Sequence, residues 1–142
     1  MKKIISILRK ARRAEYVEGP LTYNQDGLAT RHNADFIKDR KFASAYAAGK
    51  ATGSWGDEKI HWRAFVACWA AERALSLDGD FVECGVNRGG LARAIIEFTD
   101  LKSTPKKFFL FDTFDGLVEE LITEQEKDSG IRTGGYKECY AE

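Results

Sequence analysis

The sequence predicts an α/β fold built on a parallel sheet. Two short apolar runs, FVECGV from Phe81 and KFFLFDTF from Lys107, are bounded by glycine or aspartate and are typical of buried strands. The segment between them, GGLARAIIEFT, has apolar residues at helical spacing. A strand, a helix and a second strand in this order form a βαβ unit, in which the two strands run parallel.

Bulk composition indicates one ordinary globular domain. The chain has 142 residues, 44% hydrophobic and 31% charged, and its 22 basic and 22 acidic side chains cancel. Without a net charge, we expect no nucleic-acid partner. No run approaches the ~18 apolar residues that a membrane-spanning helix needs, so no transmembrane segment is predicted. Three widely spaced cysteines without a CxxC pair favour a reducing, cytoplasmic location.

Residues 1–14 are expected to form a basic amphipathic arm. Residues 1–13 carry six Lys or Arg and no acid, and their apolar residues are too few for the core of a signal peptide. The spacing suits a short helix that packs against the body of the protein or a partner subunit, with a membrane surface as the alternative. A homo-oligomer is therefore among the expected arrangements.

Residues 15–58 predict a lid followed by a helix. Turn-forming residues dominate EGPLTYNQDGLATRHNADF, which we interpret as an ordered loop or lid. Asn33 or Asp35 is the expected N-cap of a helix whose apolar residues recur until Gly49. The glycine-rich stretch GKATGSWGDEK then forms a second loop.

Residues 59–142 are interpreted as the first part of the α/β domain. They open with IHWRAFVACWAAERALSL, a helix whose large side chains recur every three or four residues, which places Trp62 and Trp69 in the core. Only the two strands above are convincing, whereas an open parallel sheet usually has about five or more. We therefore expect the front part of a longer protein, the alternative being a small domain that completes its sheet with another chain.

The turn ECGVNRGG follows the first strand, where open α/β sheets bind their ligands. Gly85 allows a tight turn, and Gly89 permits close approach of a ligand. The spacing matches neither the GxGxxG dinucleotide fingerprint nor a Walker loop. Glu83 would repel phosphate and attract an ammonium group, which predicts a ligand with a cation near this turn.

A second carboxylate, Asp112, ends the next strand, where an acid typically accepts hydrogen bonds from ribose hydroxyls. An ammonium at one strand end and a ribose at the next describe S-adenosylmethionine. The alternatives are that Glu83 caps a helix and that Asp112 is an ordinary strand-end acid. The motif FDTFDGL also suggests a phosphatase of the haloacid dehalogenase type as an alternative. However, Asp112 and Asp115 are one residue further apart than the DxDG pattern of these enzymes requires.

Four stretches, taken together, resemble a known group of enzymes. They are GLATRHNADF from Gly27, WRAFVACWAA from Trp62, GDFVECGVNRGG from Gly79 and FLFDTFDGL from Phe109. The group is the macrocin O-methyltransferase family of class I S-adenosylmethionine-dependent methyltransferases, whose members include enzymes that methylate sugar hydroxyls of macrolide antibiotics. The resemblance covers nearly everything after the arm and implies a Rossmann-like, doubly wound sheet, of which this chain would hold the N-terminal part.

The resemblance assigns roles around the glycine turn. Glu83, Gly85 and Gly89 would line the methionine part of the cofactor, and Asp112 would hold the ribose. Arg88 would meet the cofactor carboxylate, the alternative being that it solvates the start of the helix.

Further residues are assigned to the adenine and to the lid. Thr113 and Phe114 would lie by the adenine. Thr30 and His32 stand in the loop that would close over cofactor or substrate; His32 is considered as a base because the unperturbed pKa of histidine is near neutral, although a histidine in such a turn is more often structural. Trp55, in the glycine loop, is expected to face a ligand. The resemblance also implies Mg²⁺, whose ligands would not be in this chain, and no catalytic residue is assigned.

The predicted function is methyl transfer from S-adenosylmethionine to a hydroxyl of a sugar or natural product. The oxygen would attack the methyl group in line, with the reacting atoms held close and aligned. The alternatives are a non-catalytic binding or assembly module and, more weakly, the phosphatase.

Overall fold

The computed structural model describes residues 19–131, so the predicted arm lies outside the described residues. The fold is mixed α/β, with two separate two-stranded sheets. The elements along the chain are β1 (Tyr23–Gln25), β2 (Leu28–Thr30), η1 (Asp35–Lys38), α2 (Arg40–Lys50), α3 (His61–Ala74), β3 (Phe81–Cys84), α4 (Gly90–Thr99), η2 (Leu101–Ser103), β4 (Phe108–Phe111), η3 (Glu119–Leu121) and α5 (Glu124–Asp128).

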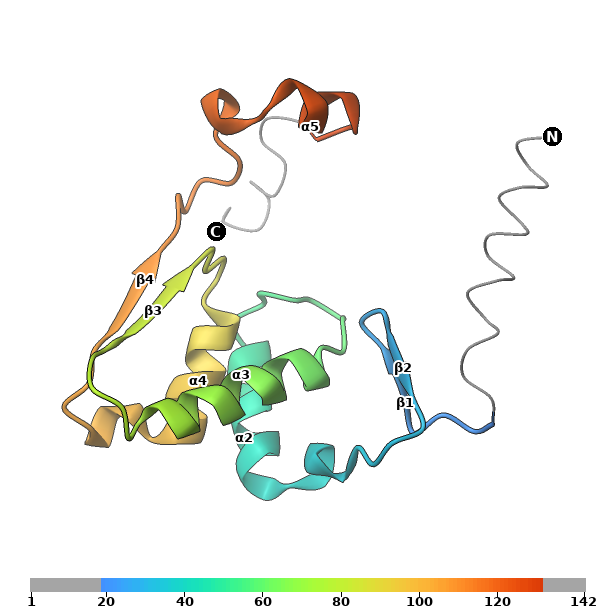
Figure 1. The fold of residues 1–142 in the computed structure, drawn as a ribbon, viewed down its shortest axis with the longest axis vertical. Coiled ribbons are helices and arrows are strands. Elements are labelled where there is room, and N and C mark those ends of the chain that lie inside the picture. The colour runs from blue at the N-terminus through green and yellow to red at the C-terminus, as the bar shows by residue number, and fades with distance from the viewer. Residues whose placement is uncertain (1–18, 132–142) are drawn as a thin grey trace.

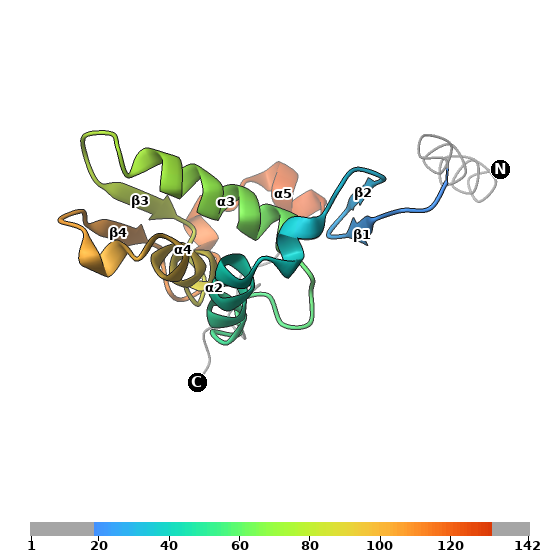
Figure 2. The ribbon, with the colours of Figure 1, turned by 90° about the horizontal axis from the view of Figure 1, so that it is seen from below.

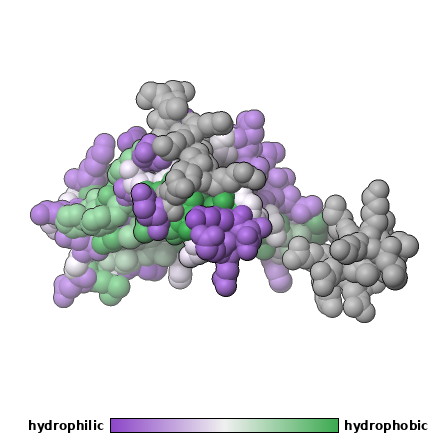
Figure 3. All heavy atoms as spheres, turned by 90° about the horizontal axis from the view of Figure 1, so that it is seen from above, coloured by the Kyte–Doolittle hydropathy of each residue, from purple (hydrophilic) through white to green (hydrophobic). Residues whose placement is uncertain are grey.

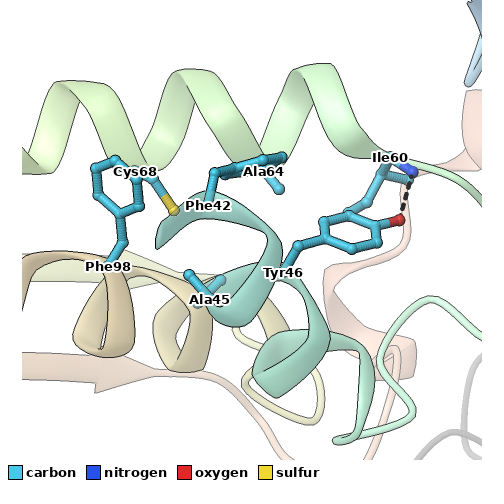
Figure 4. Close-up of a cluster of buried hydrophobic side chains, with 8 residues drawn as sticks. Phe42, Ala45, Tyr46, Ile60, Ala64, Cys68 and Phe98 are labelled. Carbon is cyan, nitrogen blue, oxygen red and sulfur yellow. Dashed lines mark hydrogen bonds between the residues drawn. The ribbon is translucent and has the colours of Figure 1, made fainter. Parts of the chain in front are cut away.

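Three helices form the centre of the molecule. Helices α2, α3 and α4 pack together, with the β3–β4 sheet along one side of the group and the β1–β2 hairpin at the opposite end (Figure 1, Figure 2). Their buried side chains meet in one cluster (Figure 4). This core comprises Phe42, Ala45 and Tyr46 of α2, Ala64 and Cys68 of α3, Ala94 and Phe98 of α4, and Ile60. None of the helices in the described part is both long and apolar enough to cross a membrane.

The predicted βαβ unit is confirmed. Strands β3 and β4 are parallel, with Phe81 opposite Phe108 and Glu83 opposite Leu110, and α4 is the helix between them. The ladder continues one residue past β3, because the Gly85 amide donates to the Phe111 carbonyl at 2.9 Å. The two strand ends that the sequence places side by side are therefore adjacent.

One face of the β3–β4 sheet is open and apolar. Side chains alternate across a strand, so Val82 and Cys84 share a face with their partners Phe109 and Phe111. All four are exposed, Val82 by 62% and Phe111 by 58%. The opposite face carries Phe81, Glu83 and Phe108, which together with α3 and α4 line an apolar groove.

Helix α2 begins later than the sequence predicts. Its N-cap is Asp39, whose side chain accepts a hydrogen bond from the Phe42 amide at 2.9 Å, and the predicted caps Asn33 and Asp35 are therefore wrong. Asn33 instead accepts from the Asp35 backbone amide at 2.6 Å, just before the short 3₁₀ helix η1, whose N-cap is Ala34. The extended backbone of Asp39 separates η1 from α2, which divides the predicted helix in two.

The predicted lid contains a β-hairpin rather than an irregular loop. Asp26 and Gly27 connect β1 and β2, both with positive φ, which is the backbone that a two-residue hairpin turn requires. Tyr23 anchors the hairpin: it is buried, its ring meets those of His61 and Trp62 edge to face, and its hydroxyl donates to the Lys59 carbonyl at 2.8 Å.

Helix α3 packs through small residues. Ala64, Cys68 and Ala71 are buried, whereas Trp69 is 52% exposed, so the predicted core position of Trp69 is wrong. Trp62 is partly buried, with its ring 4.6 Å from that of Phe36. Large residues recur at helical spacing on α3, but the residues of α3 that are fully buried have short side chains.

Two glycines allow α2 and α4 to approach closely. A Cβ on Gly49 would lie 2.5 Å from the Gly90 carbonyl oxygen and 2.7 Å from the Trp55 ring. A Cβ on Gly90 would lie 2.5 Å from the same ring. Only hydrogen fits at either position, and the loop that follows α2 folds back against the start of α4.

We predict that Gly49→Ala destabilises the protein, although alanine normally favours a helix over glycine. The added methyl meets backbone and a packed ring, and such overpacking typically costs about 1–3 kcal/mol. Denaturant unfolding followed by circular dichroism measures this change. Ser44→Ala, on the exposed face of the same helix, is the control and should stay within about 0.5 kcal/mol. A more stable Gly49→Ala protein would contradict the close approach.

We also predict that acid destabilises the protein through His61. Its ring stacks on Tyr46 at 4.2 Å, and burial, then Lys59 and Lys50, lowers its pKa. The neutral form is thus favoured by folding, so stability is complete above about pH 6.5 and falls as the pH drops below this value.

The measurement is the denaturant midpoint at pH 7.5 and at pH 5.5. His61→Phe, which keeps a stacking ring, should show a smaller drop than the wild type. His32→Gln changes an exposed histidine and should leave the drop as it is. Equal drops in the wild type and His61→Phe would refute the role of His61.

Candidate functional site

Two cavities meet at the carboxyl ends of β3 and β4, where the glycine turn begins. The smaller has a volume of about 310 Å³ and the larger about 750 Å³. Gly85 and Asn87 line both, so the two cavities lie on either side of this turn. Gly85 has a φ of +81°, and a Cβ there would meet no atom within 4 Å, so its role is conformational freedom in the turn.

The smaller cavity contains two hydrogen-bond acceptors without a donor. Glu83 Oε2 and Asn87 Oδ1 are both shielded from solvent and have no partner within residues 19–131. Burial raises the pKa of Glu83. The side-chain amide of Asn87 is oriented by its Nδ2, which donates to the Ser54 carbonyl at 3.1 Å.

Such a pair of oxygens indicates what the cavity can bind. A shielded carboxylate oxygen without a partner costs stability unless a donor or a cation meets it. A second unmatched acceptor lines the same cavity, and so does one unmatched donor, Trp55 Nε1. The arrangement fits a group that carries several N–H donors and a positive charge, as an ammonium does.

Asp112 joins the two loops that leave the strands. Its Oδ2 accepts a hydrogen bond from the backbone amide of Asn87 at 2.8 Å, and its Oδ1 accepts one from the backbone amide of Phe114 at 2.9 Å. Asn87 and Phe114 both have positive φ values near 50°, so the carboxylate stabilises two unfavourable backbone turns. The Thr113 hydroxyl also lies 3.4 Å from Oδ1, so both loops contact this carboxylate at the edge of the larger cavity.

The larger cavity is mostly apolar. Asp112 and Thr113 line it at the strand end, and the Thr113 hydroxyl donates to the Gly116 carbonyl at 2.6 Å. The remaining wall is mainly aliphatic and aromatic, from Phe111, Leu117, Val118, Leu121, Ile122 and Ile131. Seen from the end of the molecule that carries α5, hydrophobic residues gather in the middle of this face (Figure 3). A flat apolar ring with a polar attachment near Asp112 suits this space.

Loop 51–60 forms a wall of the smaller cavity. Ser54 Oγ accepts from the Gly90 amide at 2.8 Å, at the start of α4, where the N-cap Gly89 has no side chain to do so. The neighbouring Trp55 ring packs on Gly90. The loop is thus bound to the glycine turn by both a hydrogen bond and a ring contact.

The hairpin reaches the smaller cavity through its turn. Asp26 accepts two hydrogen bonds from Arg63 of α3, at 2.6 and 3.1 Å, and both residues line the cavity together with Glu58. This pair is charged and partly exposed, so it forms a polar rim around a shielded interior.

The structure brings most of the predicted cofactor residues together. Glu83 and Trp55 line the smaller cavity and Asp112 and Thr113 the larger, with Gly85 between them. Gly89 adopts a left-handed conformation and precedes α4.

Five predicted residues line neither cavity: Gly89, which only precedes α4, and the four that follow. Arg88 lines neither cavity, and its guanidinium lies against Gly53. Phe114 also lines neither and is 54% exposed. Thr30 and His32 belong to a local cluster around the Thr22 hydroxyl, in which the His32 backbone amide donates to the Thr30 hydroxyl oxygen at 3.0 Å. The hairpin contributes its turn to the site rather than these two residues.

Sequence reasoning missed four residues of the site, namely Ser54, Asn87, Asp26 and Arg63. The Asp-Gly pair at residues 26–27 is a recognisable hairpin signal and could have been found. Asn is the residue that most readily adopts positive φ after glycine, which distinguishes Asn87 within the turn. Ser54 and Arg63 act through contacts between distant segments, and no local pattern marks them.

The described part of the chain contains no group of three or more His, Cys, Asp or Glu side chains suited to a metal ion. No protein-family model matches the chain, and no curated protein or solved structure is significantly similar to it. The family resemblance of the motifs therefore stays a prediction, and the function is argued from the cavities.

We predict that Glu83→Gln stabilises the protein in the absence of ligand. The raised pKa of Glu83 means that the charged form opposes folding and the protonated form favours it. The stabilising contribution of the protonated form is present below about pH 4.5 and is lost as the pH rises through the raised pKa. At pH 7 a neutral amide avoids this penalty, and the denaturation midpoint should rise. Glu97→Gln, which removes an exposed pair with Arg93, is the control and should bring no gain. A lower midpoint for Glu83→Gln would show that the carboxylate has a structural role.

Proposed function

We propose that the protein is an S-adenosylmethionine-dependent O-methyltransferase, with the Rossmann-like fold of class I methyltransferases. The observation that carries this proposal is the pair of unmatched acceptors, Glu83 Oε2 and Asn87 Oδ1, in a cavity that adjoins Asp112. An ammonium and a ribose are the two groups that these positions suit, and S-adenosylmethionine contains both.

The parts of the cofactor match the two cavities in order. The amino-acid end fits the smaller cavity, with its ammonium at Glu83 and Asn87. The ribose hydroxyls would meet Asp112 at the strand end, and the adenine would fit the apolar larger cavity beside Thr113. Gly85 lies between the cavities and has no side chain to separate them.

When bound, S-adenosylmethionine supplies a methyl group on a positively charged sulfur. The residues of this chain hold the cofactor at both ends, which fixes the methyl group for an in-line attack by a hydroxyl oxygen. We propose a sugar or natural-product hydroxyl as the acceptor and the cytoplasm as the location. The proposal assigns no base and no metal ligand within residues 19–131.

One observation favours a second candidate, a binding or assembly module. The apolar face formed by Val82, Cys84, Phe109 and Phe111 is exposed and suits a protein contact. No observation favours the phosphatase, because Asp115 lines neither cavity.

Calorimetry with two probes tests the proposal. S-adenosylhomocysteine contains the amino-acid end, whereas 5′-deoxy-5′-methylthioadenosine lacks it but keeps the adenosine. We expect the wild type to bind both. Glu83→Gln should weaken the binding of S-adenosylhomocysteine about tenfold or more, in line with the loss of a charge-assisted contact. It should leave the affinity for the second probe unchanged. Asp112→Asn should weaken both.

Circular dichroism and the denaturation midpoint show whether each variant is folded. Asp78→Asn, an exposed acid beyond α3, is the matched control and should bind both probes as the wild type does. A folded wild type that binds neither probe would refute the methyltransferase proposal and leave the module as the better account.

A further inference from the structure

Loop 51–60 is fixed to the glycine turn at Ser54. The residue makes two contacts of different kinds: its side-chain Oγ accepts from the Gly90 amide at 2.8 Å, and its backbone carbonyl accepts from the Asn87 side chain at 3.1 Å. Thr52 Oγ1 lies 3.0 Å from the same Oγ and also donates to the Gly49 carbonyl. A hydrogen-bonded chain therefore runs from the end of α2 to the start of α4.

This chain determines where the Asn87 oxygen lies. The Asn87 backbone is held by Asp112, and its side-chain nitrogen is held by the Ser54 carbonyl. With both points fixed, Oδ1 takes the remaining position on the amide, shielded and without a partner within residues 19–131. Asn87 is the second of the two acceptors that define the smaller cavity.

Ring packing makes the position of Ser54 rigid. The next residue, Trp55, lies against Gly90, and its ring is 5.5 Å from that of Tyr46. Because neither Gly49 nor Gly90 leaves room for a side chain, the loop fits into the contact between α2 and α4. A shift of Ser54 would carry Asn87 with it.

We propose that Ser54 is a positioning residue for the amino-acid end of the cofactor, acting through Asn87; this inference rests on the proposed function. Ser54 presets the Asn87 oxygen in the cavity that Glu83 also lines, so that an ammonium group meets acceptors that are already in place. Among the residues that the structure describes, none of loop 51–60 lines the larger cavity. Asn87 lines both cavities, but the oxygen that Ser54 positions is assigned to the ammonium, so we expect Ser54 to affect recognition of the amino acid rather than of the adenosine.

The experiment measures the dissociation constants of S-adenosylhomocysteine and 5′-deoxy-5′-methylthioadenosine for four proteins: the wild type, Ser54→Ala, Asn87→Ala and the double variant. Ser54→Ala removes the hydroxyl contact to Gly90 but keeps the carbonyl that binds Asn87. We expect it to weaken S-adenosylhomocysteine about 3- to 10-fold, the effect of one hydrogen bond, and to leave the second probe unchanged. The double variant should bind no more weakly than Asn87→Ala alone.

Each other result overturns the inference. If Ser54→Ala weakens both probes equally, the role of Ser54 is general stability; if it weakens neither, the loop contact does not matter for binding. If the two substitutions are additive, Ser54 does not act through Asn87. Binding of neither probe by the wild type would refute the proposed function and this inference together.

Ser76→Ala is the matched control, since its hydroxyl donates to the Arg73 carbonyl at the exposed end of α3, away from both cavities. It should leave both dissociation constants unchanged. A loss of S-adenosylhomocysteine affinity in this control comparable to that in Ser54→Ala would also overturn the inference.

Discussion

The close contact between α2 and α4 is the constraint on which the site depends. Gly49 and Gly90 leave no room for side chains, and the space between the helices is filled by Trp55 from the following loop. That loop forms one wall of the smaller cavity and holds Asn87 in place. Packing in the core and the shape of the cavity therefore have a common origin: a helix contact close enough to exclude a methyl group also fixes the position of an acceptor oxygen.

The candidate site contains a residue that lowers the stability of the unliganded protein. Glu83 sits on the covered face of a short parallel sheet, with one oxygen shielded and unmatched. A hydrophobic or neutral side chain would suit this position better, because a shielded charge without a partner opposes folding. Residues that reduce the stability of the unliganded protein are typical of binding sites, where the ligand supplies the missing partner. The shielded Glu83 oxygen, rather than the glycine pattern, is the strongest indication that the turn binds a ligand.

Sequence alone predicted the parts of the fold that depend on local pattern. The two parallel strands, the helix between them and the strand-end acids Glu83 and Asp112 follow from apolar runs bounded by glycine and aspartate. The errors have physical causes. Trp69 lies on the exposed side of α3, and the spacing of large residues does not reveal which side of this helix is buried. Ser54 gains its role from contacts with residues more than thirty positions away, so only the folded chain identifies it.

Asp112 shows why two interpretations of a strand-end acid need not compete. From the sequence, a structural acid and a ribose ligand are alternatives. In the structure the carboxylate accepts the Asn87 and Phe114 amides and thereby holds two left-handed turns, one at each strand end. The same contacts fix both oxygens at the edge of the larger cavity, where a ribose hydroxyl would meet them. The structural role is thus what orients the carboxylate for a ligand, since an acid without these amides would have no fixed position from which to bind one.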